Sequence, residues 1–267
     1  MSIGFIGTGS IAEAVITGLL HSNNPPEKII VSPRNNKRAT TLASKFTQVE
    51  VAKDNQAVID NCDTVCLSIR PQIAESVLNA LVFPKHMTVV SFVATYSISI
   101  LESLVAPANK IVRLVPLPPA AKCMGPLVIS PPDEEVEALF GGIGTIVHAE
   151  NDDQYHAIAA VTAMMAPYFG LLSSVTNWLK DRGLPAEAAD TYVATLFHVV
   201  SDAGLSINGQ GFETIATEYA TPGGLNEQLL RELTNAGCYD NISKGLSLIF
   251  ERINGRAGLK DTINHYD

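Results

Sequence analysis

Two glycine-containing motifs, one at each end of the chain, have residue types and spacing suited to binding anionic ligands. The first is the stretch Gly7–Ala12, which reads GTGSIA and follows the apolar run Ile3–Ile6. The second is the stretch Thr221–Gly224, which reads TPGG. Backbone N–H groups that no side chain covers, together with the positive end of a helix dipole, bind phosphates and carboxylates. The motifs therefore predict one site for a phosphate-bearing ligand and another for a small carboxylate.

The first motif has the strand, turn and helix context of a dinucleotide-binding site. The first glycine allows a turn with positive φ, and the second lets the main chain approach a pyrophosphate closely. The small Ala12 lets the next helix pack on the strand, and apolar residues at helical spacing follow it from Val15 to Leu20. We expect contacts with the cofactor from Gly7, Thr8, Gly9, Ser10, Ile11 and Ala12.

The end of the second predicted strand, residues 28–32, indicates which dinucleotide is bound. A site that prefers NADH usually places a carboxylate there for the ribose 2′-hydroxyl. This chain has Ser32 and Arg34 instead, with Lys37 and Arg38 close behind. Hydroxyl and guanidinium groups suit a 2′-phosphate through charge-assisted hydrogen bonds. The sequence therefore predicts NADPH as the cofactor, with NADH less favoured.

Apolar runs alternate with helical segments as far as residue 148, which predicts parallel strands covered on both faces. The strands are expected at residues 49–51, 64–69, 88–93 and 111–115, with weaker strands at 127–129 and 145–148 on either side of an acidic helix at 133–140. Ligands bind beyond the carboxyl ends of such strands. Further candidates for the cofactor or substrate wall are therefore Asn55, Ser68, Arg70, Ala94 and the turn at residues 116–120.

Helical signals replace strand signals after residue 148. Long apolar helices are expected at residues 155–179 and 186–205, with two more near the C-terminus. We place the domain boundary in the polar stretch at residues 149–154. The fold class is therefore α/β, with a Rossmann-type parallel-sheet domain in residues 1–150 and an all-helical domain in residues 151–267.

The helical half is rich in apolar side chains. The run at residues 157–172 contains Pro167 and is short for a membrane span, so we expect a buried helix. The helices between residues 155 and 205 carry more apolar surface than a small domain hides by itself, which predicts a homodimer or a larger homo-oligomer.

Composition narrows the class of partner. With 267 residues, a net charge of −9 and a pI near 5.1, the chain is not expected to bind nucleic acid or an anionic membrane. The four cysteines form no CxxC pair, and the chain does not begin with a basic segment. These features favour reduced thiols in the cytoplasm. No metal site is expected.

The second motif looks like a helix start, with Thr221 as N-cap and Pro222 at the first helical position. Two glycines in a first helical turn cost about 1 kcal/mol each relative to alanine. Binding of a small carboxylate by the N–H groups of Gly223, Gly224 and Leu225 would explain them. A close helix crossing that excludes Cβ atoms is the alternative.

Both motifs, with Arg70-Pro71-Gln72 and Arg113-x-x-Pro116 between them, resemble those of the pyrroline-5-carboxylate reductase family. The resemblance covers nearly the whole chain in the right order. It implies a helical domain that dimerises by interleaving helices, and NAD(P)H-dependent reduction of a cyclic imine to proline. It also implies that Thr221 and Asn226 are catalytic candidates. The substrate-binding residues it implies are Thr221, Gly223, Gly224, Leu225 and Asn226.

Three departures from the family pattern keep other functions open. Leu117 and Pro118 replace polar residues at the nicotinamide end, and Met164-Met165 replaces a glycine-containing stretch. Asn226 stands where the family often has threonine, a suspected proton donor, and an amide is a poor acid. One alternative is an oxidoreductase acting on another imine or on a carbonyl compound. A hydroxy-acid dehydrogenase would need a catalytic lysine such as Lys180 or Lys244. Another alternative is a non-catalytic, NADPH-binding regulatory protein.

Overall fold

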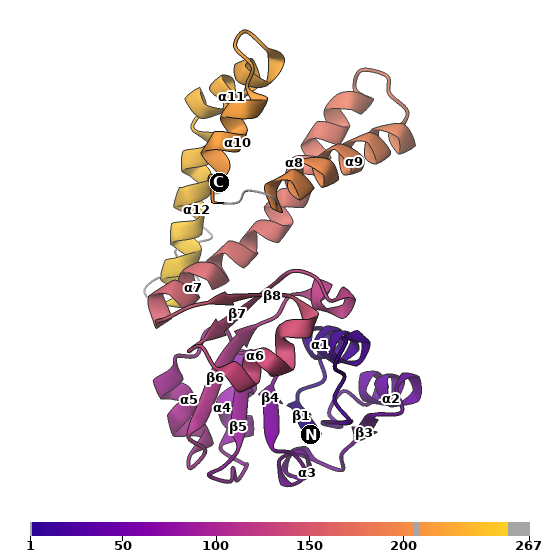
Figure 1. Ribbon diagram of the computed structural model, residues 1–267, viewed down its shortest axis with the longest axis vertical. Coiled ribbons are helices and arrows are strands. Elements are labelled where there is room, and N and C mark those ends of the chain that lie inside the picture. The colour runs from indigo at the N-terminus through magenta and orange to yellow at the C-terminus, as the bar shows by residue number, and fades with distance from the viewer. Residues whose placement is uncertain (1, 206–208, 256–267) are drawn as a thin grey trace. The chain divides into compact units, whose positions relative to one another are not determined.

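The chain divides into two compact units, residues 1–159 and 160–267, and the computed structural model describes residues 2–205 and 209–255 (Figure 1). The boundary expected from the sequence lies just before helix α7 (Asp152–Val161), whereas the division falls near the end of that helix. The expected end of the second domain, residue 267, lies outside the described residues. The functional domain limits therefore stay a prediction.

An eight-stranded sheet forms the centre of the first unit, in the order β3-β2-β1-β4-β5-β6-β7-β8. The first six strands are parallel, β7 runs antiparallel to β6, and β8 runs parallel to β7. The strands are β1 (Ser2–Ile6), β2 (Lys28–Val31), β3 (Val49–Val51), β4 (Thr64–Leu67), β5 (Thr88–Ser91), β6 (Lys110–Val115), β7 (Pro126–Ser130) and β8 (Thr145–His148).

Short helices connect these strands, and local chemistry sets where several of them begin. The side chains of Asn35, Asp54, Ser97 and Asp133 each accept a hydrogen bond from the N–H group three residues ahead. The helices are α1 (Ser10–His21), α2 (Asn36–Lys45), α3 (Asn55–Asp60), α4 (Pro71–Leu78), α5 (Ile98–Val105) and α6 (Glu134–Phe140), with 3₁₀ turns η1 (Pro118–Lys122) and η2 (Gly141–Ile143).

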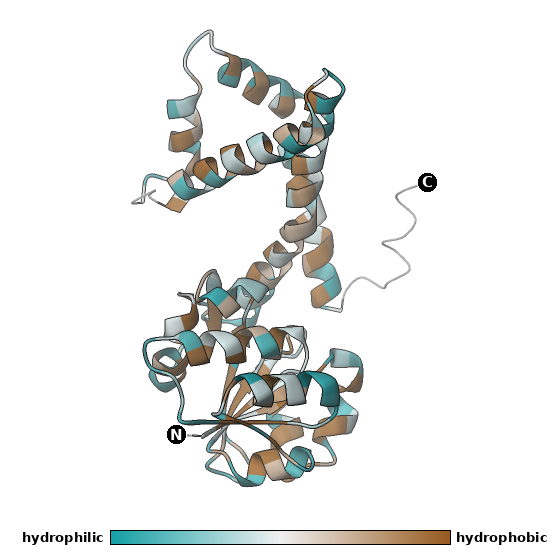
Figure 2. Cartoon of the chain, turned by 90° about the vertical axis from the view of Figure 1, so that its right-hand side faces the viewer, coloured by the Kyte–Doolittle hydropathy of each residue, from teal (hydrophilic) through white to brown (hydrophobic). Residues whose placement is uncertain are grey.

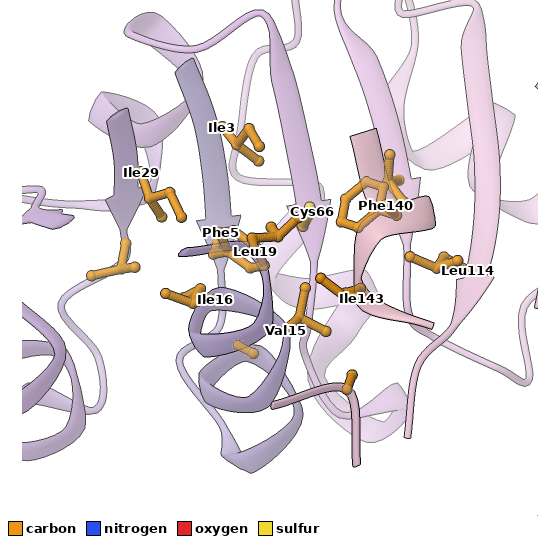
Figure 3. Close-up of a cluster of buried hydrophobic side chains, with 14 of the residues drawn as sticks. Ile3, Phe5, Val15, Ile16, Leu19, Ile29, Cys66, Leu114, Phe140 and Ile143 are labelled. Carbon is orange, nitrogen blue, oxygen red and sulfur yellow. The ribbon is translucent and has the colours of Figure 1, made fainter. Parts of the chain in front are cut away.

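The two faces of the sheet are covered by different helices. Side chains of α1, α2 and α6 form one cluster with the sheet, in which Phe5, Leu19 and Phe140 are fully buried (Figure 3). Side chains of α3, α4 and α5 form a second cluster on the other face, around Val65 and Leu101. Burial on both faces explains why these strands read as continuous apolar runs.

The strand order fixes where a ligand binds in such a sheet. The chain moves outward from β1 through β2 to β3, then returns to place β4 on the other side of β1. The connections after β1 and β4 therefore leave in opposite directions, which opens a crevice at the carboxyl ends of these strands. Gly7 follows β1 and Ser68 follows β4, so both lie at this edge.

The second unit is helical throughout its described regular structure. Near the C-terminus it has three helices where the sequence predicts two, because the turn at residues 220–224 separates α10 from α11. Helix α8 packs on α9, and α11 packs on α12. The elements are the 3₁₀ turn η3 (Thr162–Met164) and helices α8 (Met165–Lys180), α9 (Ala186–Leu205), α10 (Phe212–Tyr219), α11 (Leu225–Asn235) and α12 (Cys238–Ile253).

Apolar side chains of these helices are largely exposed in the single chain, and brown segments appear along all of them in Figure 2. Phe169 on α8 is 67% exposed and Val199 on α9 is 58% exposed. The continuous helix Asp152–Lys180 is long and apolar enough to cross a membrane by length and composition, and only 11% of its most apolar window is buried. The prediction of a buried helix at residues 157–172 is therefore wrong for the chain by itself.

Candidate functional site

The turn between β1 and α1 gives a separate reason for each glycine in the first motif. Gly7 has φ of +97°, and a Cβ atom there would overlap the carbonyl oxygen of Ser68. Gly9 precedes α1 in an extended conformation, and a Cβ atom there would meet no atom within 4 Å. Ala12 is fully buried against the sheet. Gly7 therefore lets β1 approach β4, whereas the bare backbone at Gly9 borders open space at a helix N-terminus.

Two of the predicted cofactor ligands hold this turn instead of facing solvent. Ser32 is fully buried, and its Oγ accepts a hydrogen bond of 2.9 Å from the Gly7 N–H. The Thr8 hydroxyl, also buried, donates to the Ser32 carbonyl oxygen at 2.8 Å. The predicted contacts of Ser32 with a 2′-phosphate and of Thr8 with the cofactor stay predictions, and the structure adds a second role for both side chains. Both residues position the backbone of the glycine turn.

The basic residues after β2 differ in how they are held. Arg34 is exposed, two residues beyond Ser32 at the carboxyl end of the strand. Arg38 in α2 forms an ion pair with Glu13 of α1, at 3.2 Å between Nη1 and Oε2. Because Glu13 lies in the first turn of α1, this pair joins the two helices that border the turn. Arg34 is thus the residue of this segment whose position best suits a 2′-phosphate.

The remaining predicted contacts come from the next parallel strands. Asn55 is the first residue of α3 after β3, Ser68 and Arg70 follow β4, and Ala94 follows β5. Arg70 is exposed and the other three are half-buried. Topology therefore brings all four to the edge that carries Gly7 and Gly9, although their individual roles stay predictions.

The turn after β6 is held close to α1. A Cβ atom on Gly18 of α1 would overlap the carbonyl oxygen of Ala120, so a glycine is needed for η1 to pack on this helix. Leu117 caps η1 and Pro118 begins it. The first departure from the family pattern, Leu117 with Pro118, therefore lies in a segment fixed against the helix of the glycine motif. The second, Met164 with Met165, lies at the junction of η3 and α8.

A buried arginine forms a second polar centre, which the sequence shows only as one charged residue in an apolar strand. Arg113 on β6 is 1% exposed and pairs with Asp152 at the start of α7, at 2.6 Å between Nη2 and Oδ1. Its Nη2 also donates to the Ser130 hydroxyl at 3.0 Å, and its guanidinium lies 3.9 Å from the centroid of the Tyr155 ring. Burial raises the pKa of Tyr155, and the arginine charge opposes this. The cluster anchors the first turns of α7 to the sheet.

The Thr221–Gly224 motif forms a turn before α11, not its first turn. The N–H of Gly224 donates to the Thr221 carbonyl oxygen at 2.8 Å, and Gly223 has φ of +74°. Proline followed by a glycine with positive φ is typical of a type II turn. Helix α11 begins at Leu225 with Gly224 as N-cap. The predicted helix start at Thr221 is therefore wrong, because Gly223 adopts a left-handed conformation that ends any helical run.

Two side chains of α11 form hydrogen bonds with main-chain groups in or just before this turn. The N–H of Gly223 donates to the Glu227 carboxylate at 2.6 Å, and the Asn226 Nδ2 donates to the Tyr219 carbonyl oxygen at 3.1 Å. Thr221 and Leu225 are exposed, and Leu225 is 85% exposed. The predicted substrate residues thus lie together on one turn, but one of the amides expected to bind a substrate carboxylate already binds a carboxylate of the chain.

Other chemistry has less support in the described residues. Lys180, a candidate for the alternative dehydrogenase, is paired with Asp190 at 3.2 Å between α8 and α9. Within residues 2–205 and 209–255, no group of three or more His, Cys, Asp or Glu side chains is placed to hold a metal ion. Burial raises the pKa of the Cys62 thiol to about 11 and that of the Cys66 thiol well above its usual value, so neither is a reactive thiolate at neutral pH.

The glycine turn, helix α1 and the strand order define a Rossmann-type dinucleotide-binding domain. Residues 2–95 match the family model described as NADP oxidoreductase, coenzyme F420-dependent. The chain is 29% identical to the pyrroline-5-carboxylate reductase of Haemophilus influenzae over 64% of its length and 65% of that protein. It is 26% identical to the enzyme of Corynebacterium melassecola over 88% of its length and 91% of that protein.

Comparison with solved structures extends this likeness to the fold. The Plasmodium falciparum pyrroline carboxylate reductase, solved with NADP bound, superimposes with a TM-score of 0.78 and 19% identity, covering 97% of this chain and 98% of that one. The chain is therefore a nicotinamide-dinucleotide-dependent oxidoreductase that is similar in sequence and fold to pyrroline-5-carboxylate reductases.

Proposed function

We propose that the protein reduces a small cyclic imine with NADPH by hydride transfer, and that pyrroline-5-carboxylate, reduced to proline, is the first substrate to test. The observation that carries the proposal is the bare backbone at Gly9, which borders open space at the N-terminus of α1. An amide-lined helix start of this kind suits a pyrophosphate. The names of the relatives support the class of substrate.

The preference for NADPH rests on the end of β2. No carboxylate occurs between Ser32 and Arg38, and the exposed Arg34 suits a 2′-phosphate. The relative from Plasmodium falciparum was solved with NADP bound. We therefore assign pyrophosphate binding to the Gly7–Ala12 turn and 2′-phosphate binding to Arg34.

Imine reduction demands little acid–base chemistry from the protein. Reduced nicotinamide supplies a hydride at its C4 position. The imine nitrogen receives its proton from water, from Thr221 or before binding, so the poor acidity of Asn226 is no obstacle. The chain then contributes orientation and exclusion of water, which supply much of the acceleration in such reactions.

We also propose that the protein is a homodimer or larger oligomer in the cytoplasm. The exposed apolar side chains of α8 and α9 support burial against a second copy of the chain. The four cysteines are free thiols, which suits a reducing compartment.

One assay tests the catalytic proposal. NADPH oxidation is followed by absorbance with pyrroline-5-carboxylate, with other cyclic imines and with 2-keto acids, and NADPH binding is measured separately by fluorescence. Turnover of any cyclic imine supports the proposal. Binding of NADPH without turnover of any imine would favour the regulatory protein, and turnover of carbonyl compounds alone would favour the other oxidoreductase.

A further inference from the structure

Two neighbouring loops at the carboxyl edge of the sheet carry three of the predicted cofactor contacts. Strands β4 and β5 pair in parallel, so the loops that follow them leave the same edge side by side. Among the described residues, the last main-chain hydrogen bond between these segments runs from the Phe92 N–H to the Leu67 carbonyl oxygen, at 3.0 Å. The loops are residues 68–70 and 92–97, and the contacts on them are Ser68, Arg70 and Ala94.

The side chain of Tyr96 joins these loops beyond the ends of the strands. Its hydroxyl donates a hydrogen bond of 3.1 Å to the carbonyl oxygen of Pro71, the residue after Arg70. Its ring packs against the apolar cluster that α3, α4 and α5 form with the sheet, and its N–H donates to the Val93 carbonyl oxygen at 3.2 Å. Because its backbone, ring and hydroxyl are each held, Tyr96 fixes the first loop relative to the second.

The buried Arg113 approaches the same loop from β6. Its Nη1 lies 3.5 Å from the Tyr96 carbonyl oxygen, at the outer limit of a hydrogen bond. Its Nη2 makes shorter contacts with Ser130 and Asp152. Arg113 therefore supports the main chain at Tyr96 only weakly, and the Tyr96 hydroxyl is the stronger link between the two loops.

The strand order indicates which half of a dinucleotide these loops border. Arg34 follows β2 on one side of β1, whereas β4 and β5 lie on the other side. With the pyrophosphate at the turn after β1 and the 2′-phosphate at Arg34, the adenosine half lies toward β2. The nicotinamide half then extends toward the ends of β4 and β5.

We propose, on the basis of the cofactor binding and function proposed above, that Tyr96 is a positioning residue for the nicotinamide half of NADPH. Its hydroxyl holds the two loops at their working distance before the cofactor arrives. Such preorganisation raises affinity, because the ligand does not have to order the loops as it binds. Without this hydrogen bond the cofactor orders the loops itself, so the loss falls on binding and not on the hydride step.

The test removes one hydroxyl at a time from the full-length protein. Tyr96→Phe keeps the ring and its packing but breaks the link to Pro71. Tyr155→Phe is the matched control, because among the described residues the buried Tyr155 hydroxyl has no hydrogen-bond partner. Calorimetric titration measures the affinity for NADPH and for adenosine 2′,5′-bisphosphate, which carries the 2′-phosphate but no nicotinamide. The Tm is recorded for every variant, with kcat and the KM for NADPH in the reduction of pyrroline-5-carboxylate.

We expect Tyr96→Phe to weaken NADPH binding about fivefold, as for the loss of one neutral hydrogen bond, and to raise the KM for NADPH equally with kcat retained. The affinity for adenosine 2′,5′-bisphosphate should not change, and Tyr155→Phe should change neither affinity.

A lower Tm of Tyr96→Phe with unaltered NADPH affinity, or equal losses for NADPH and adenosine 2′,5′-bisphosphate, overturns the role of Tyr96 and leaves the imine reductase intact. The expected binding pattern without turnover of any cyclic imine by the unmodified protein overturns the reductase and keeps the role of Tyr96.

Discussion

The two units of the chain differ in how much of their apolar surface is buried within the chain. In the first unit each face of the sheet is covered by helices, and large side chains such as Phe5 and Phe140 are fully buried. In the second unit α10, α11 and α12 have no buried residue among those described, and α8 has only Thr176. The first unit therefore contains its own core, whereas we propose that the second is one half of a core that a second copy of the chain completes.

This difference indicates what each unit needs in order to fold. Burial of apolar area is the main favourable contribution to folding, at roughly 25 cal/mol per Å². The first unit obtains this contribution within one chain. The exposed helices of the second unit would obtain it from a partner that covers them, which is the physical reason for the oligomer proposed above.

The largest effect is expected from charges placed on the exposed helices. The double substitution Phe169→Lys and Val199→Lys removes two large apolar side chains from each subunit of a dimer. At about 1.5–3 kcal/mol for each buried side chain, four side chains per dimer contribute about 6 kcal/mol or more of binding free energy. Their loss should raise the dissociation constant of the dimer roughly ten-thousandfold. Analytical ultracentrifugation should then find monomers at micromolar concentration.

Val82→Lys is the matched control for this substitution. Val82 is 73% exposed in the first unit, and a lysine there should leave the sedimentation coefficient unchanged. If the unmodified protein already sediments as a monomer, the idea that the second unit is half of a core is incorrect.

The next largest effect concerns the buried charge of the first unit. Arg113→Ala removes a guanidinium that pairs with Asp152 and lies against Tyr155. Asp152 is 48% exposed and stays hydrated, so the cost comes from the lost charge-assisted hydrogen bonds, at about 1.5–3 kcal/mol, and from the cavity that the buried arginine leaves. Thermal unfolding at fixed protein concentration should therefore show a large fall in Tm.

Lys110→Ala is the matched control, because it removes a positive charge from the same strand at a position that is more exposed than Arg113. Lys110 forms ion pairs with Asp133 and Glu135, but its side chain is 31% exposed. Surface ion pairs contribute about 1 kcal/mol or less, so the Tm should change little. Equal losses for Arg113→Ala and Lys110→Ala would contradict the view that Arg113 anchors α7.

The sequence predicts most of the first unit because its signals are local. Two spaced glycines after an apolar run place the turn and the start of α1, and continuous apolar runs place the parallel strands. The buried role of Ser32 is not local, because it depends on β2 lying beside β1, which brings its hydroxyl to Gly7. Arg113 likewise shows its role only once Asp152 is brought beside it.

The second unit is harder to predict because its signals compete. Thr221 and Pro222 favour a helix start, but the left-handed conformation of Gly223 delays the helix until Leu225. The long apolar helix at residues 157–172 suggests burial, and in one chain nothing covers most of it. Sequence periodicity reports that a face is apolar, but not which molecule covers it.

A smaller effect distinguishes the two glycines of the first motif. Gly7→Ala forces a side chain into a left-handed conformation and against the Ser68 carbonyl, so we expect a loss of about 1–3 kcal/mol in unfolding free energy. Gly9→Ala meets open space, so we expect a change within about 0.5 kcal/mol and a clear loss of NADPH affinity. Denaturant unfolding and fluorescence titration measure the two quantities. Unaltered NADPH affinity in folded Gly9→Ala would remove the pyrophosphate from this turn.

The smallest effect tests cofactor choice at the end of β2. Arg34→Ala removes one exposed guanidinium, and loss of one charge-assisted hydrogen bond costs about 1.5 kcal/mol, close to tenfold in NADPH affinity. NADH lacks the 2′-phosphate, so its affinity should stay constant. Lys85→Ala removes an exposed cation before β5, at the opposite edge of the sheet, and should affect neither cofactor.

Arg38→Ala completes this comparison, because Arg38 is paired with Glu13 and is therefore less available to a phosphate. If Arg34→Ala weakens NADPH and NADH equally, its guanidinium contacts a group that both cofactors share. If Arg38→Ala alone discriminates between the cofactors, the 2′-phosphate replaces Glu13 as its partner. In this second case the selectivity would be encoded by the helix pair α1 and α2 and not by the strand end.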